Sequence, residues 1–139
     1  MKDELDRKIL YYLKENSRAS YAQIGREIGL SASAVGERIQ RLEETEVIKG
    51  YRTLIDPKKM GLSVSAYILM SLESKNFHSF VEIIKDYPEI EHCSRVTGEN
   101  CLIMKINVKD SGHLQKFIDR LAKHGNPSTQ VILSDLITN

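Results

Sequence analysis

Residues 20–42 have the sequence SYAQIGREIGLSASAVGERIQRL, which predicts two short helices joined by a tight turn. Ser20 and Gln23 match a capping box, so the first of these helices is expected to begin there. Gly29 predicts its end, because glycine adopts the left-handed conformation after a helix without a steric penalty. Ser31 can cap the next helix, whose apolar residues recur at helical spacing. The stretch therefore predicts a helix-turn-helix.

The flanking sequence extends this prediction on both sides. Residues 3–15 predict a preceding helix with Asp3 as its N-cap, and the helix that Ser31 caps is expected to run to about Glu44. Val47-Ile48, a Lys49-Gly50 turn and the alternating residues 51–55 predict a short strand that ends at Asp56-Pro57, as a linker or a wing. We therefore expect a helix-turn-helix domain over residues 1–50 and a strand or linker over residues 51–60.

Residues 61–139 show a different pattern, in which strand, helix and strand occur twice in succession. Strands are expected at residues 66–70, 90–97, 101–108 and 130–136, and helices are expected to be capped by Asn76 and Ser111, the second ending at Gly125. This order is typical of the ferredoxin-like βαββαβ fold. The fold class is thus α+β, with an N-terminal winged-helix-like helix-turn-helix and a C-terminal ferredoxin-like domain.

Three of the expected strands are apolar at consecutive positions, namely residues 67–70, 102–104 and 131–133. Successive side chains point to opposite faces of a sheet, so both faces are expected to be apolar, although the helices of this fold cover only one. Large exposed apolar patches mark interfaces. We therefore expect a second copy to pack sheet to sheet, as a homodimer.

The helix after Ser31 carries the features that indicate function. Its outward positions begin with small residues and continue with charged ones, a pattern that suits insertion into a DNA major groove. Lys49 and Arg52 follow as candidate phosphate contacts. The alternative is a solvated, charged surface, and Gly36 within the helix either permits close approach to DNA or has no role. The predicted DNA-binding residues are Ser31, Ser33, Ala34, Glu37, Arg38, Arg41, Lys49 and Arg52.

Composition agrees with a folded globular protein: 41% of residues are hydrophobic, 28% are charged, and the net charge is +1. The N-terminus has no apolar stretch of the signal-peptide or transmembrane type, so a cytoplasmic location and no membrane partner are expected. The two cysteines are too few for a disulfide framework.

The sequence also carries residues of two other classes of function. Cys93, Cys101 and His92 could form a metal or thiol sensor, but a simple hairpin pairs Cys93 with Met104 and Val96 with Cys101, which places the two sulfurs on opposite faces. A small enzyme is the other class, and the four histidines are dispersed without a nucleophile or phosphate loop. No catalysis, no cofactor and no metal site are therefore expected.

Several segments resemble the leucine-responsive/asparagine regulator (Lrp/AsnC) family, and the resemblance covers the whole chain. They are residues 5–10 (LDRKIL), 24–30 (IGREIGL), 31–42, 47–51 (VIKGY) and 96–98 (VTG). The resemblance implies prokaryotic transcription factors that bind double-stranded DNA, form dimers and often octamers, and respond to amino acids bound between their C-terminal domains. An architectural DNA binder without an effector is the remaining alternative.

The resemblance also implies an effector site. The family commonly has a Gly-Asp-Tyr-Asp-like loop between the second and third strands, and this chain has Gly98, Glu99, Asn100 and Cys101 there, so a thiol replaces the second acid. Ser128 and Thr129 match the family's polar stretch that enters the last strand. A plain hairpin turn is the alternative interpretation of residues 98–101.

Overall fold

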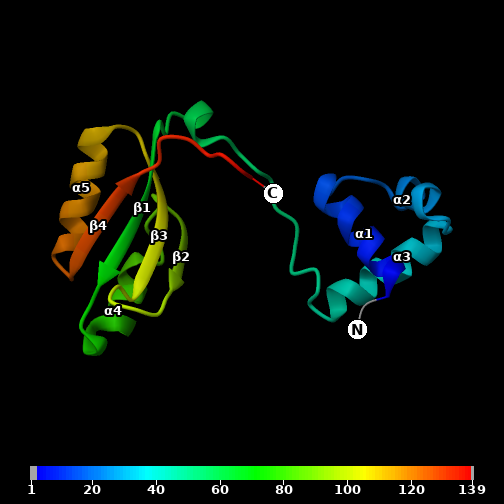
Figure 1. Cartoon of the computed structure of the whole chain (residues 1–139), viewed down its shortest axis with the longest axis horizontal. Coiled ribbons are helices and arrows are strands. Elements are labelled where there is room, and N and C mark those ends of the chain that lie inside the picture. Colours follow the sequence, from blue (N-terminus) through cyan, green and yellow to red (C-terminus); the bar gives the residue numbers. More distant parts are fainter. Residues whose placement is uncertain (1–2, 139) are drawn as a thin grey trace. The chain divides into compact units, whose positions relative to one another are not determined.

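The computed structural model describes residues 3–138 and divides the chain into two compact units, Met1–Leu54 and Ile55–Asn139. The first unit consists of helices and the second of a sheet with two helices packed on it (Figure 1). The boundary between the units lies within the predicted linker, residues 51–60. No helix among the described residues is long and apolar enough to cross a membrane.

The first unit contains α1 (Glu4–Glu15), α2 (Tyr21–Ile28) and α3 (Ala32–Glu44). Each begins as the sequence predicts: Asp3 caps α1, Ser20 and Gln23 form a complete capping box on α2, and Ser31 caps α3. Gly29 ends α2 in the left-handed conformation, with φ of 76°. The helix-turn-helix prediction is confirmed.

One apolar cluster joins the three helices. Its buried members recur at helical spacing, so each helix presents one apolar stripe to the other two. They are Ile9, Leu13, Ile24, Val35, Ile39 and Leu42.

The predicted strand at residues 51–55 is wrong. The structure shows no strand from residue 45 to residue 63, and the next regular element is the short 3₁₀ helix Pro57–Met60, capped by Asp56. The alternating pattern of Tyr51 to Ile55 predicted a strand, but a strand forms only where its backbone groups have a partner to bond.

The second unit is a four-stranded antiparallel sheet in the order β2-β3-β1-β4. Two helices connect its strands, which gives the βαββαβ order of the ferredoxin-like fold that the sequence predicts. The elements are β1 (Val64–Ser71), α4 (Phe77–Ile84), β2 (Ile90–Arg95), β3 (Leu102–Val108), α5 (Ser111–Ala122) and β4 (Asn126–Val131).

Three details of this unit differ from the predictions. Asn76 makes no capping bond, because the 3₁₀ turn Ser74–Asn76 precedes α4 and gives Asn76 helical dihedrals. Asp110 caps α5 in place of Ser111, by accepting a bond from the backbone N–H of His113 at 2.8 Å. The last strand is β4, Asn126–Val131, and not residues 130–136.

Gly125 also has a different role from the predicted one. Helix α5 ends at Ala122, and a Cβ on Gly125 would lie 2.4 Å from the carbonyl oxygen of Ser71. This glycine therefore allows the chain that enters β4 to pass close to β1.

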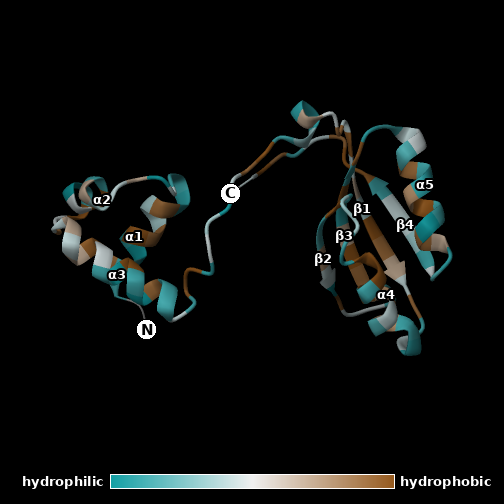
Figure 2. Cartoon of the chain, turned by 180° about the vertical axis from the view of Figure 1, so that it is seen from behind, coloured by the Kyte–Doolittle hydropathy of each residue, from teal (hydrophilic) through white to brown (hydrophobic). Residues whose placement is uncertain are grey.

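The two helices cover one face of the sheet. Every second residue of β1 and β3 is buried against α4 and α5. Along α5, hydrophobic residues are interspersed with hydrophilic ones, as expected for a helix with one buried side (Figure 2). The opposite face carries Tyr67, Leu69 and Ile103 in its two central strands, and Tyr67 is 39% exposed. Among residues 55–138 no helix covers this outer face.

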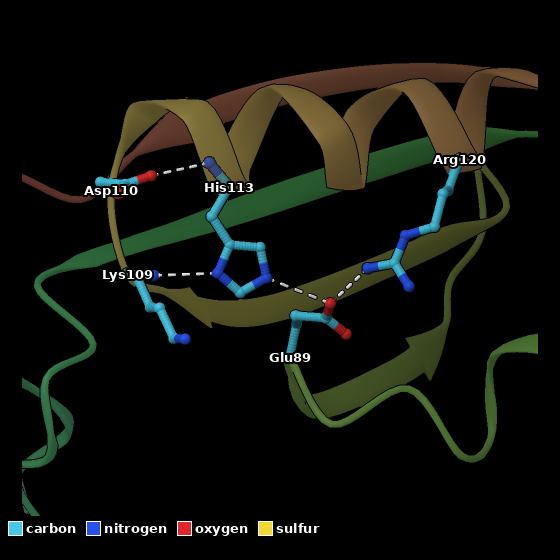
Figure 3. A network of polar contacts seen from close by, with 5 residues as sticks. All are labelled: Glu89, Lys109, Asp110, His113 and Arg120. Carbon is cyan, nitrogen blue, oxygen red and sulfur yellow. Dashed lines mark hydrogen bonds and ion pairs between the residues drawn. The ribbon is translucent and has the colours of Figure 1, made fainter.

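A buried carboxylate fixes α5 to the loop before β2 (Figure 3). Glu89 is 8% exposed and pairs with Arg120 and with His113, whose Nε2 is 3.2 Å away. The backbone N–H of Lys109 donates to Nδ1 of the same imidazole at 3.1 Å. Burial alone would raise the pKa of Glu89, but the hydrogen bonds from its own N–H, His113 and Arg120 outweigh burial and lower it.

Candidate DNA interface and effector site

Helix α3 presents an exposed face that begins with serines and continues with charges. Ser31 and Ser33 are exposed, and their hydroxyl oxygens are 3.2 Å apart, while Ser31 also accepts from the N–H of Ala34. Glu37 and Arg41 are exposed farther along the helix, and neither has an ion-pair partner within residues 3–138. Small polar residues at the start of a helix and a long cation about two turns later are able to bond bases and phosphates.

Arg38 has a different environment from the rest of this face. Its Nη1 lies 2.7 Å from a carboxylate oxygen of Asp3 and 2.9 Å from one of Asp6, and its side chain is 21% exposed. Asp3 also accepts the N–H of Asp6, so the residue that caps α1 binds α3 as well. The structure therefore places Arg38 in an ion-pair cluster that joins α1 to α3.

The pKa directions agree with this cluster. The N–H of Asp6 and the guanidinium of Arg38 hold the pKa of Asp3 below its usual value, and the two carboxylates raise the pKa of Arg38. No local sequence pattern relates Asp3 and Asp6 to Arg38, because 35 and 32 residues separate the partners.

Two glycines of the helix-turn-helix are explained by close packing. A Cβ on Gly25 would lie 2.2 Å from the carbonyl oxygen of Leu30, so this position lets the turn fold back onto α2. A Cβ on Gly36 would lie 3.1 Å from the ring of Tyr21. Gly36 thus provides space for Tyr21 of α2, a role that no local sequence pattern predicts.

Backbone and side-chain hydrogen bonds attach the segment after α3 to that helix. The hydroxyl of Tyr51 donates to Glu43 at 2.9 Å, and burial together with this carboxylate raises the pKa of Tyr51 to about 12. Lys49 and Arg52 lie on either side of Tyr51, and both are exposed. The bond therefore holds two cations close to the end of α3.

The predicted effector residues lie at one end of the sheet. Gly98 has φ of 107°, which only glycine adopts readily, and the N–H of Val96 bonds the carbonyl of Cys101 to close the hairpin. The backbone N–H of Cys101 donates to the carbonyl oxygen of Met70, and the Sγ of Cys101 lies 3.5 Å from the same oxygen. Glu99 is exposed.

The start of β4 lies at the same end, on the other side of β1. Met70 pairs with Leu102 in β3 and with Pro127 in β4, so the hairpin and the entry to β4 are separated by one strand. Ser128 and Thr129 are consecutive in β4, and their side chains therefore point to opposite faces. A pocket of about 290 Å³ lies at this end, lined by Ser71, Leu72, Glu73, Asn76, His124, Gly125 and Asn126.

The cysteines do not favour the thiol or metal alternative. The predicted pairing of Cys93 with Met104 is confirmed. Burial raises the pKa of the Cys93 thiol, whereas reactive thiols and metal ligands need the thiolate. Within residues 3–138 no group of three or more histidine, cysteine, aspartate or glutamate side chains could hold a metal ion.

A helix-turn-helix unit joined to a ferredoxin-like unit defines a two-domain protein of the helix-turn-helix DNA-binding class. Residues 3–43 match the AsnC-type helix-turn-helix domain, and residues 65–138 match the Lrp/AsnC ligand binding domain. The chain belongs to the Lrp/AsnC family of transcriptional regulators.

Individual relatives are similar in sequence to this chain over most of its length. The HTH-type transcriptional regulator LrpC of Bacillus subtilis is 35% identical over 136 residues, which are 98% of this chain and 94% of LrpC. The regulator FL11 of Pyrococcus horikoshii is 34% identical over 117 residues, 84% of this chain and 78% of FL11.

Solved structures show the same fold. The structure of Bacillus subtilis LrpC superimposes with a TM-score of 0.95 at 34% identity, covering 100% of this chain and 99% of LrpC. A transcriptional regulator of Neisseria meningitidis, solved as a complex with L-Met, superimposes with a TM-score of 0.93 at 25% identity. The match covers 99% of this chain and 94% of that regulator.

Proposed function

We propose that this transcriptional regulator binds double-stranded DNA with α3 in the major groove. The observation that carries the proposal is the difference between the two arginines of α3. Arg38 is held in ion pairs by Asp3 and Asp6, whereas Arg41 is exposed. Ser33 and Glu37 are exposed on the same helix and, with Arg41, form the face that reads base edges. Ser31 and Ala34 belong to the same N-terminal turn, where they bond or contact the sugar-phosphate backbone.

The segment after α3 supplies backbone contacts in this proposal. Lys49 and Arg52 neutralise phosphates, and Tyr51, anchored to Glu43, keeps them close to the helix. Phosphate contacts position a protein on DNA without reading sequence, so these cations contribute affinity and salt dependence.

The experiment is a titration of the full chain against the DNA upstream of its own gene, with random DNA as competitor, at two salt concentrations. Arg41→Ala should weaken specific binding by about 1 to 3 kcal/mol if Arg41 reads a base edge. Lys14→Ala, which removes an equal charge from the exposed last turn of α1, is the matched control and should retain specific binding. Specific binding that is equally strong in Arg41→Ala would contradict the proposed recognition face.

We further propose that an amino acid modulates DNA binding from the end of the sheet where Gly98, Glu99, Asn100 and Cys101 lie. The bound L-Met of the Neisseria meningitidis relative supports this class of ligand. Glu99 is exposed and offers a carboxylate to the ligand ammonium. Ser128 and Thr129, on opposite faces of β4, are the two candidates for a hydroxyl contact near the entry to that strand. Repeating the DNA titration with each amino acid tests the proposal, and an unchanged affinity throughout would favour the architectural alternative.

We also propose that the chain acts as a homodimer, from which an octamer can assemble. The support is the uncovered outer face of the sheet, with Tyr67, Leu69 and Ile103 in its central strands. A dimer carries two copies of α3 and so matches pseudo-palindromic half-sites in successive major grooves.

A further inference from the structure

A groove of about 500 Å³ lies between α4 and the edge strand β2, and it extends along β2 from Ile90 to Arg95. Its apolar walls are Phe77, Val81 and Ile84 from α4, Ile90 from β2 and Leu102 from β3. Cys93 lies among them and is half-buried. This volume and an apolar lining with a few polar groups at the rim are typical of small-molecule sites.

One cation at the rim has no carboxylate partner within residues 3–138. The guanidinium of Arg95 lies 4.3 Å from the centroid of the Phe77 ring, so the ring supports one of its faces. Stacking leaves the N–H donors, which lie in the plane of the guanidinium, free to bond two oxygens at once. Arg95 is therefore positioned to bind a planar anionic group at the mouth of an apolar groove.

The other charges around the groove are already paired. Lys85 lies 2.6 Å from Glu82, and Glu91 lies 3.3 Å from Lys105. The groove thus offers one unpaired cation and no unpaired carboxylate among its lining residues. This charge balance suits a carboxylate and provides nothing for an ammonium.

We propose that the groove between α4 and β2 binds a monocarboxylate with a branched aliphatic or phenyl body, and that Arg95 holds the carboxylate. The apolar body lies on Val81, Ile84 and Ile90, where its burial drives binding. The absence of an ammonium partner distinguishes this site from the proposed amino-acid site at residues 98–101. None of residues 98–101, Ser128 and Thr129 lines the groove.

The test uses the full chain with 3-phenylpropionate as the probe and with phenylalanine, which adds an ammonium to the same body, as its comparison. Cys93 reports occupancy in a Cys101→Ser background, because a ligand in the groove should slow its alkylation by iodoacetamide. Amide chemical shifts locate the probe. The proposal expects saturable protection of Cys93 by 3-phenylpropionate and at least tenfold weaker protection by phenylalanine.

Two variants separate the carboxylate contact from general effects of charge. Arg95→Gln should weaken the binding of 3-phenylpropionate at least tenfold, whereas Lys116→Gln, which removes an exposed cation of α5, should leave it unchanged. Binding that survives Arg95→Gln, shift changes in residues 98–101 without any in α4 or β2, or no protection up to the solubility limit of the probe would each overturn the proposal. The amino-acid titration of DNA binding is a separate readout, so either proposal can fail alone.

Discussion

Arg38 illustrates how a residue on the outward side of a helix can serve the fold, since it joins α3 to α1. Asp6 is 5% exposed, and a buried carboxylate needs a partner. Arg38 is that partner, and Asp3 extends the pair toward solvent. The sequence placed Arg38 on the outward face of α3, which is correct for its backbone position, but the long side chain turns toward α1.

We predict that Arg38→Ala destabilises the first unit by about 1 to 3 kcal/mol, because it leaves Asp6 buried without its cation. Amide hydrogen exchange of α1 and α3 in the full chain measures this loss for the unit itself. Arg41→Ala should change the same exchange by no more than about 0.5 kcal/mol, since Arg41 is exposed and outside the cluster. Unchanged exchange in Arg38→Ala, combined with lost DNA affinity, would instead assign Arg38 to the DNA.

The same cluster has an expected pH dependence. The pKa of Asp3 is lowered in the folded chain, so its interactions stabilise the fold above the unfolded pKa, near 3.8, and this contribution is lost as the pH falls through the lower folded pKa. The cluster is therefore expected to remain intact at neutral pH.

At the scale of elements, the tight turn between α2 and α3 depends on Gly25. The N–H groups of Gly29 and Leu30 both bond the carbonyl of Gly25, and the carbonyl of Leu30 comes back to within 2.2 Å of where a Cβ would be. The turn and the helix therefore pack backbone against backbone.

Gly25→Ala should destabilise the helix-turn-helix by about 1 to 3 kcal/mol, because the added methyl group forces the backbone of the turn to move. Gly112→Ala is the matched control in α5, where the nearest atom to the new Cβ is a side-chain oxygen of Asp110 at 3.4 Å. There the higher helix propensity of alanine, about 1 kcal/mol, is expected to dominate. Thermal unfolding of both variants measures the difference, and an equally stable Gly25→Ala would show that the turn tolerates the shift.

The elements that the sequence predicted well are those specified by local signals. The caps Asp3, Ser20 and Ser31 and the glycine at position 29 each act within four residues, and they fixed the three N-terminal helices. Strand β4 was placed too late because Asn126 and Pro127 disfavour strands, although an edge strand accepts proline where no N–H is needed. The predicted strand at residues 51–55 does not form, because an alternating pattern does not show whether a partner strand is available for hydrogen bonding.

At the scale of the whole molecule, the outer face of the sheet is the surface on which we propose that two chains pack. The sequence predicted apolar residues on both faces, and the structure places Tyr67, Leu69 and Ile103 on the face opposite the helices. Polar residues surround this centre, including Ser65, which bonds Asn107 at 2.6 Å. An apolar centre with a polar rim is the usual anatomy of a protein interface.

We predict that Ile103→Glu converts a dimer into a monomer, because a carboxylate at the centre of the interface would be buried without a partner. Sedimentation equilibrium should give twice the chain mass of 15.8 kDa for the unchanged chain and the chain mass for the variant. Lys116→Glu on the exposed side of α5 is the control and should remain dimeric, while far-ultraviolet circular dichroism checks that both variants are folded. A monomeric unchanged chain would remove the sheet-to-sheet proposal, and a dimer that persists in Ile103→Glu would place the interface elsewhere on the molecule.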